Sequence, residues 1–195
     1  MTGERPANPW ERRVTFVLST ATAVAVVAVM GTYIYGANTS PKHWAEGSAR
    51  LHAPPSEVLA LLHDIERRPD WRPDVVAVGR KSDPSDPREV WRELDDEGDR
   101  FDFEVVARPD DGLVLRTEAA EQIGYEATWT FQVEAAGEGS RLHLVEEGFV
   151  DNPLFRGVFW LRDGPKESVV DELVWLGVAL DGAAPTVTDV RVEER

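Results

Sequence analysis

One run without a charged residue, Val14 to Tyr35, constrains this chain more than any other feature. At about 1.5 Å of rise per residue, its 22 residues form a helix of roughly 33 Å, enough to cross a hydrocarbon core of about 30 Å. Tyr33 and Tyr35 lie at one end, where interfacial aromatic residues are usually found. The alternative is a buried helix of a globular domain, but such a helix normally has one polar face, whereas this run has no charged residue. The run therefore predicts a single transmembrane helix.

The charges around this run predict its orientation. Arg5, Arg12 and Arg13 precede it, whereas Lys42 and Arg50 are the only Lys or Arg residues close behind it. By the positive-inside rule this bias favours a cytoplasmic N-terminus, so we expect a single-pass membrane protein with an extracytoplasmic domain. A cleavable signal peptide is the alternative. Its apolar core is normally about 7 to 15 residues and ends in an A-x-A-like site, neither of which fits well here.

The charge balance limits the partners of the remaining chain. Residues 1–40 contain three Arg and two Glu, a net charge of +1, so the total of −15 leaves −16 for residues 41–195. Such an acidic domain repels phosphate backbones, which excludes nucleic acid as a partner. The absence of Cys excludes disulfides and thiolate metal sites, and no HExxH pattern is present. We therefore expect no metal and no cofactor.

Hydrophobic periodicity predicts one α+β domain after a short polar linker over 36–42. The expected strands cover 44–51, 75–81, 89–94, 101–107, 113–119, 125–133 and 142–150. The expected helices cover 56–62, an interrupted piece over 65–71, and two C-terminal segments separated by the break at 163–165. The tail over 183–195 is expected to be loose, although the alternation over 186–192 also fits an edge strand.

Three segments resemble sequence motifs of a known superfamily. The segment Leu51–Val58, LHAPPSEV, resembles the "ap-x-x-x-V" start of its first helix, and Asp64–Asp74, DIERRPDWRPD, resembles its "D-x-x-x-x-P-x-W-x-P" segment. Asn152–Gly157 also resembles the start of the long helix in single-domain members. Together with the order of elements, these segments resemble the START-like superfamily, also called SRPBCC or polyketide cyclase/dehydrase-like. The resemblance covers about residues 45–181, within an expected domain over 43–182.

This resemblance implies a helix-grip fold, in which a curved antiparallel sheet of six or seven strands surrounds a long C-terminal helix. It also implies an apolar cavity for a hydrophobic small molecule or lipid. Aromatic side chains with a few polar groups are typical of such pockets, although most buried aromatics only fill a core. The candidate ligand-binding residues are Trp71, Arg92, Phe103, Tyr125, Trp129, Phe131, Glu146, Phe159 and Leu173.

Glu146 is the most informative polar candidate. By strand alternation it lies on the same side as Leu142 and Leu144, where an ionised carboxylate is costly without a partner. Arg92 is the partner that the alternation of its own strand suggests. The alternative is a strand-end glutamate that reaches solvent through a bulge at Gly148.

The four histidines, His43, His52, His63 and His143, show no metal-ligand spacing. His143 should point outward if Leu142 and Leu144 point inward. No GxSxG, Walker or GxGxxG pattern is present, so we expect no catalytic residue of those classes.

The favoured hypothesis is a membrane-anchored domain that binds a hydrophobic small molecule or lipid without catalysing a reaction. The first alternative is a cyclase or dehydratase on a polyketide-like substrate that uses Glu146 or a histidine as an acid or base. The second is a module whose acidic surface recruits a basic partner, with a collapsed cavity. No pattern predicts the oligomeric state or identifies the ligand.

Overall fold

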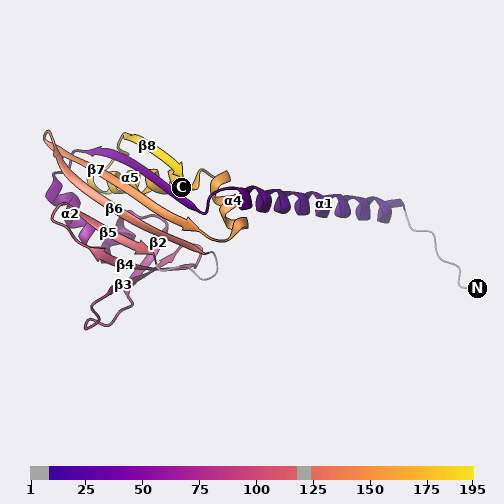
Figure 1. Ribbon diagram of the computed structural model, residues 1–195, viewed down its shortest axis with the longest axis horizontal. Helices are drawn as coiled ribbons and strands as arrows, with labels where there is room; N and C mark the ends of the chain where they lie inside the picture. The colour runs from indigo at the N-terminus through magenta and orange to yellow at the C-terminus, as the bar shows by residue number, and fades with distance from the viewer. Residues whose placement is uncertain (1–8, 118–123) are drawn as a thin grey trace, which may run out of the picture.

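Helix α1 (Pro9–Asn38) projects away from the rest of the chain (Figure 1). The computed structural model describes residues 9–117 and 124–195, with side chains at 17, 19–117 and 124–195. The Ser19–Asn38 part of α1 is long and apolar enough to cross a membrane, and almost none of it is buried by other residues. The helix predicted over 14–35 is therefore present. It extends to Asn38, so the connection to the next element shrinks from 36–42 to residues 39–41.

Among the described residues, eight strands form one antiparallel sheet in the order β2-β3-β4-β5-β6-β7-β1-β8. The strands are β1 (Lys42–Leu51), β2 (Val75–Arg80), β3 (Glu89–Asp95), β4 (Arg100–Ala107), β5 (Gly112–Thr117), β6 (Tyr125–Ala136), β7 (Gly139–Val150) and β8 (Val187–Glu194). The helices after α1 are α2 (Pro55–His63), the 3-10 turn η1 (Ile65–Arg67), α3 (Arg68–Trp71), α4 (Pro153–Leu161) and α5 (Gly164–Asp181). The last two residues of the strand predicted over 113–119 lie outside the described residues.

The hairpin of β6 and β7 is the longest pairing in the sheet. The strands pair without a register shift from Tyr125 opposite Val150 to Ala136 opposite Gly139. Gly137 in the connecting turn has a φ of 69°, a conformation that glycine adopts without a steric penalty. Because the register is continuous, the alternation seen in the sequence decides which β7 side chains face the interior.

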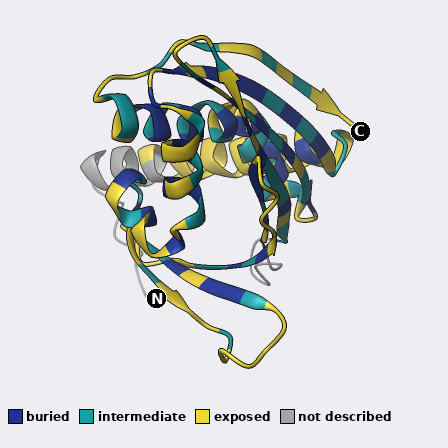
Figure 2. Ribbon diagram, turned by 90° about the vertical axis from the view of Figure 1, so that its left-hand side faces the viewer, coloured by how far each residue is buried: buried dark blue, intermediate teal, exposed yellow. Residues whose placement is uncertain are grey.

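Helix α5 packs against the concave side of the sheet, and the buried residues of both face each other (Figure 2). Val169, Leu173 and Leu176 are fully buried in this layer. Gly47 of β1 allows the close approach, since a Cβ there would lie 2.9 Å from Val169 Cγ1. The predicted break before α5 is present as well: Asp163 has a φ of 54°, and Pro165 opens the helix. This is the helix-grip fold that the sequence implied.

The tail that was expected to be loose forms β8, the edge strand beside β1. Ala45 pairs with Val192 and His43 pairs with Glu194. Without β8 the outer edge of β1 would present unpaired backbone groups, which sheets generally cover. The edge strand allowed by the alternation over 186–192 is therefore the correct interpretation, and the sheet has one strand more than expected.

Candidate functional site

Two cavities lie between the sheet and the helices and share Arg72, Asp74 and Trp129 in their walls. The first has a volume of about 470 Å³ and extends along α4 and α5. The second has a volume of about 360 Å³ and extends under β3, β4 and β5. Such volumes are within the range of small-molecule sites, about 300–1,000 Å³.

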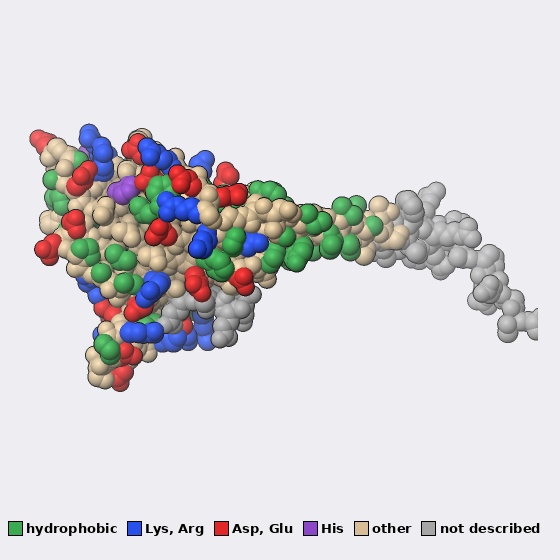
Figure 3. Space-filling view, in the orientation of Figure 1, with side chains coloured by type: hydrophobic (Ala, Val, Ile, Leu, Met, Phe, Trp, Pro, Cys, Tyr) green, Lys and Arg blue, Asp and Glu red, His purple; other side chains and the backbone are tan. Residues whose placement is uncertain are grey.

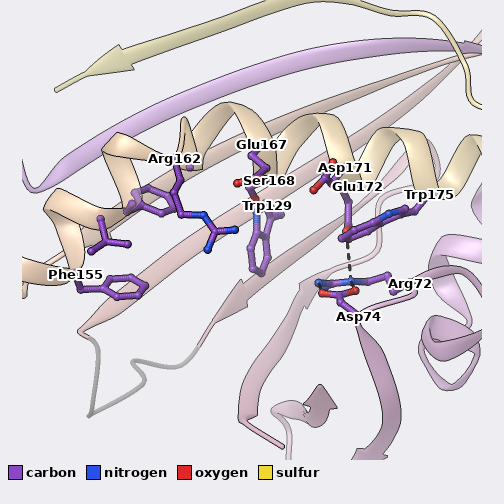
Figure 4. A pocket seen from close by; sticks show the side chains of 13 residues that line it. Arg72, Asp74, Trp129, Phe155, Arg162, Glu167, Ser168, Asp171, Glu172 and Trp175 are labelled. Carbon is purple, nitrogen blue, oxygen red and sulfur yellow. Dashed lines mark hydrogen bonds and ion pairs between the residues drawn. The ribbon is translucent and has the colours of Figure 1, made fainter. Parts of the chain in front are cut away.

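Aromatic side chains form much of both walls. In the first cavity these are Trp129, Phe155, Phe159 and Trp175, and in the second they are Phe101, Phe103, Tyr125 and Trp129. Figure 4 shows Trp129 projecting from the sheet toward α5, while Arg72 lies beneath the ring of Trp175. The common wall therefore combines aromatic surface with a fixed positive charge.

Arg72 is held by three carboxylates. Its guanidinium lies 2.6 Å from Asp74 Oδ2, 3.5 Å from Glu93 Oε2 and 3.6 Å from Glu172 Oε2. Burial alone would lower the pKa of Arg72, but the charges of Glu172 and Glu93 and the hydrogen bond to Asp74 raise it above its ordinary value. Arg72 is therefore a permanent cation in the cavity wall.

Arg68, about one helical turn before Arg72, belongs to the same buried network of charges. It forms an ion pair with Glu93 and lies 3.6 Å from Glu172 Oε1. Its guanidinium also lies over the rings of Trp71 and Phe103, at 5.1 and 5.2 Å from their centroids. Burial raises the pKa of Glu172, and the two arginines counteract that effect.

Glu146 lies behind the aromatic wall and is fully buried. Its Oε1 accepts hydrogen bonds from Tyr125 Oη at 2.9 Å and from His43 Nε2 at 2.8 Å, and its Oε2 accepts one from Trp129 Nε1 at 3.1 Å. His43 Nδ1 has no partner among the described residues, so the proton belongs on Nε2, where the carboxylate accepts it. Burial, followed by the Glu146 charge, raises the pKa of Tyr125 well above its ordinary value. Glu146 thereby fixes the rings of Tyr125 and Trp129.

A family model described as polyketide cyclase / dehydrase and lipid transport matches residues 42–171, about two thirds of the chain. The chain belongs to this family. The START-like, polyketide cyclase/dehydrase-like membership expected from LHAPPSEV and DIERRPDWRPD is thus confirmed. No curated protein sequence matches the chain.

Solved structures with the same fold include aromatase/cyclases. Zhui aromatase/cyclase from Streptomyces sp. R1128 is 17% identical, with a TM-score of 0.59 over 71% of this chain and 93% of that one. The di-domain ARO/CYC BexL from the BE-7585A biosynthetic pathway is 15% identical, with a TM-score of 0.55 over 88% of this chain and 60% of that one. The di-domain ARO/CYC StfQ from the steffimycin biosynthetic pathway is 11% identical, with a TM-score of 0.57 over 74% of this chain and 51% of that one. The chain therefore spans less than two thirds of either di-domain protein, and at these identities the likeness shows the fold alone.

Within this polyketide cyclase/dehydrase and lipid transport domain, the predicted burial of Glu146 is correct. Trp129 and Ala45 lie directly opposite it on the neighbouring strands, and β7 shows no bulge at Gly148. The alternative of a solvent-reaching glutamate is therefore wrong. A Cβ at Gly148 would lie 2.1 Å from the His43 ring, so this glycine instead makes room for the histidine that binds Glu146.

The predicted pairing of Glu146 with Arg92 is wrong. Arg92 points outward and pairs with Asp102, with Nε 2.6 Å from Oδ1 and a second nitrogen 2.8 Å from Oδ2. In β3, Trp91 and Glu93 are the residues that point toward the interior. The apolar residues Val90 and Leu94, on the same side as Arg92, had suggested the opposite orientation. Both Trp91 and Glu93 are buried, the latter paired with Arg68 and Arg72.

The remaining predicted ligand-binding residues separate into two groups. Phe103, Tyr125, Trp129 and Phe159 line the two cavities. Phe131 and Leu173 are fully buried in the packed core and Trp71 lies beneath Arg68, and none of these three lines either cavity. His143 contacts Ser48 Oγ at 3.0 Å across the strands, consistent with its predicted outward position.

Sequence reasoning missed several residues of the cavity walls. These are Phe155 and Trp175 together with the charged set Arg68, Arg72, Asp74, Glu93 and Glu172. His43, which binds Glu146 behind the wall, was also missed. Arg68 and Arg72 lie inside the DIERRPDWRPD segment that carried the resemblance, which was the one available signal. In sequence their charges are indistinguishable from those of a solvated helix.

Proposed function

We propose that this protein holds a hydrophobic small molecule or lipid in the space between the sheet and α5, without catalysing a reaction, and that α1 anchors it in a membrane. The observation that carries the proposal is the pair of adjoining cavities with aromatic walls on either side of Trp129 and Arg72. A packed interior would have argued against a ligand. An interaction module with a collapsed cavity is accordingly disfavoured.

The polar groups in and behind the walls support binding rather than chemistry. Glu146, behind the wall, already accepts three hydrogen bonds and holds the rings of Tyr125 and Trp129, and Arg72 in the wall is shared among three carboxylates. Arg72 and Asp74 line both cavities and are suited to orient a ligand, while the aromatic rings contribute the apolar contact. The short connection over residues 39–41 keeps the domain close to the end of α1, which favours ligands that dissolve in a bilayer.

Mass spectrometry of the detergent-extracted full chain tests the proposal. We expect a hydrophobic compound to co-purify with the wild-type protein at near-stoichiometric amount. Ser168→Trp, which fills the first cavity from α5, should abolish this, while Val178→Trp on the exposed side of α5 should retain it. Equal recovery from both variants, or none from the wild type, would overturn the proposed binding site.

A cyclase or dehydratase is the second candidate, because the cavity also contains groups with altered proton affinity. Burial raises the pKa of Asp171, and Glu167 and Asp74 add to the effect, while burial raises that of Glu172. Both carboxyls line the first cavity. On this account Asp171→Asn would abolish turnover of a poly-β-ketone substrate and leave its binding intact. If the wild-type protein binds the substrate but does not convert it, a cyclase or dehydratase activity is excluded.

A further inference from the structure

Helix α4 carries an apolar face that no other described element covers. Leu154, Val158 and Leu161 are spaced by four and three residues, so they share one side of the helix, and they are 37%, 42% and 64% exposed. Residues 41–195 have a net charge of −16, from the total of −15 less the +1 of residues 1–40, yet Pro153–Leu161 contains no Asp or Glu. An apolar, carboxylate-free face on so acidic a domain indicates an apolar partner.

One flank of α4, beside the apolar face, is fixed to the last turns of α1 at backbone distance. A Cβ at Gly157 would lie 2.2 Å from Thr32 O, and a Cβ at Gly36 would lie 1.9 Å from Pro153 O. The buried Arg156 donates from Nε to Gly36 O at 2.6 Å and from a terminal nitrogen to Val150 O at 2.8 Å. A cation at the carboxyl end of α1 also complements the helix dipole. These contacts hold α4 against the last turns of α1.

The contact between α1 and α4 determines how deep α4 lies relative to the bilayer. The uncharged run of α1 begins at Val14, directly after Arg12 and Arg13, and about 20 residues cross a hydrocarbon core, so a span that begins there ends near Tyr33. The contacts with α4 are at Thr32 and Gly36, four residues or about 6 Å apart along α1. The headgroup layer on each side is about 5–7 Å thick. Figure 1 shows α4 at the end of the domain from which α1 emerges, and Figure 3 shows hydrophobic side chains along α1 up to the domain.

We infer that α4 lies in the headgroup layer of the bilayer that contains α1, with Leu154, Val158 and Leu161 inserted among the upper acyl carbons. This inference rests on the proposed anchor, and it adds a second, surface-bound element to it. Val158 belongs both to the exposed face and to the wall of the first cavity, beside Phe155 and Phe159. The cavity therefore opens at the membrane surface, and a ligand passes between the bilayer and the cavity without crossing water.

The absence of cysteine allows a direct test with single-cysteine variants of the full chain. Each variant is spin-labelled and reconstituted in phosphatidylcholine vesicles, and the accessibility of the label to oxygen is compared with that to a water-soluble nickel chelate. Leu161→Cys reports α4 and Val27→Cys reports α1. Val106→Cys, a 45% exposed valine on β4, is the matched control for an apolar surface site away from α4.

We expect the labels at residues 27 and 161 to be accessible to oxygen and protected from nickel, and the label at 106 to show the reverse. Oxygen access at residue 27 with nickel access at 161 would overturn the position of α4 and leave the anchor intact. Nickel access at both would overturn the anchor and this inference together. The ligand test on Ser168→Trp in detergent is independent of either outcome.

Transfer kinetics give a second measurement. Leu161→Glu should slow the uptake of a fluorescent fatty acid from vesicles several-fold, with unchanged affinity in detergent. Val106→Glu should alter neither. Equal transfer rates for wild type and Leu161→Glu would contradict the inferred path.

Discussion

At the scale of single residues, the interior of this domain is organised by buried charges that satisfy one another. Glu146 accepts from Tyr125, His43 and Trp129, and Arg72 is shared among Asp74, Glu93 and Glu172. Buried charges are tolerated only when paired and hydrogen-bonded. These two clusters fix the aromatic rings that line the cavities.

Glu146→Gln should therefore destabilise the fold. The amide places an N–H donor where the carboxylate accepted, so at least one of the three donors is left buried without a partner. We expect the free energy of unfolding to fall by about 1–3 kcal/mol. Urea denaturation of the full chain in detergent measures this, with Glu134→Gln on the exposed side of β6 as the control. A loss no greater than that of the control would show that Glu146 does not hold the wall.

The pairing of Arg92 with Asp102 predicts that the stability of the fold changes at acid pH. Hydrogen bonds from Arg92, then from Lys81, lower the pKa of Asp102 from 3.8 to about 2, against the effect of burial. A lowered folded-state pKa gives stability that is present above pH 3.8 and is lost as the pH falls toward 2. Arg92→Gln should reduce this loss, with an effect below about 1 kcal/mol because the pair is partly exposed. Thermal unfolding at pH 2–5 checks it, and an unchanged pH profile would contradict the pairing.

At the scale of helices and strands, much of the fold could be predicted from periodicity and turn residues. The β6 alternation, the break at 163–165 and the inward position of Glu146 follow from spacing alone. The inward side of β3 could not be predicted from spacing, because Glu93 is stabilised in the interior by ion pairs with arginines that are distant in sequence. The contact of α4 with α1 could not be predicted from the sequence either, because it joins Gly36 and Gly157, which lie far apart in the chain.

Gly157→Leu should separate α4 from α1. A side chain at this position meets Thr32 O at 2.2 Å, and backbone cannot move aside as a flexible side chain would. We expect a loss of about 1–3 kcal/mol in stability and faster proteolysis between residues 38 and 42. Gly79→Leu, at a site with open space on β2, is the matched control. Equal proteolysis of both variants would mean that the helices are not held together at Gly157.

At the scale of the whole molecule, an apolar helix leads directly into an acidic domain with an interior cavity. The arginines before residue 14 favour an extracytoplasmic domain. Ser85→Cys, on an exposed loop, should then react with a membrane-impermeant maleimide in right-side-out vesicles. Reaction only in inside-out vesicles would place the domain in the cytoplasm.

Ligand binding to the purified full chain tests the central claim most directly. A fluorescent fatty acid is titrated into the wild type, Ser168→Trp and Val178→Trp in the same detergent. We expect saturable one-to-one binding for wild type and Val178→Trp, and an affinity at least about tenfold weaker for Ser168→Trp, equivalent to about 1.4 kcal/mol. Three identical binding curves, or no saturable binding by the wild type, would contradict a ligand site between the sheet and α5.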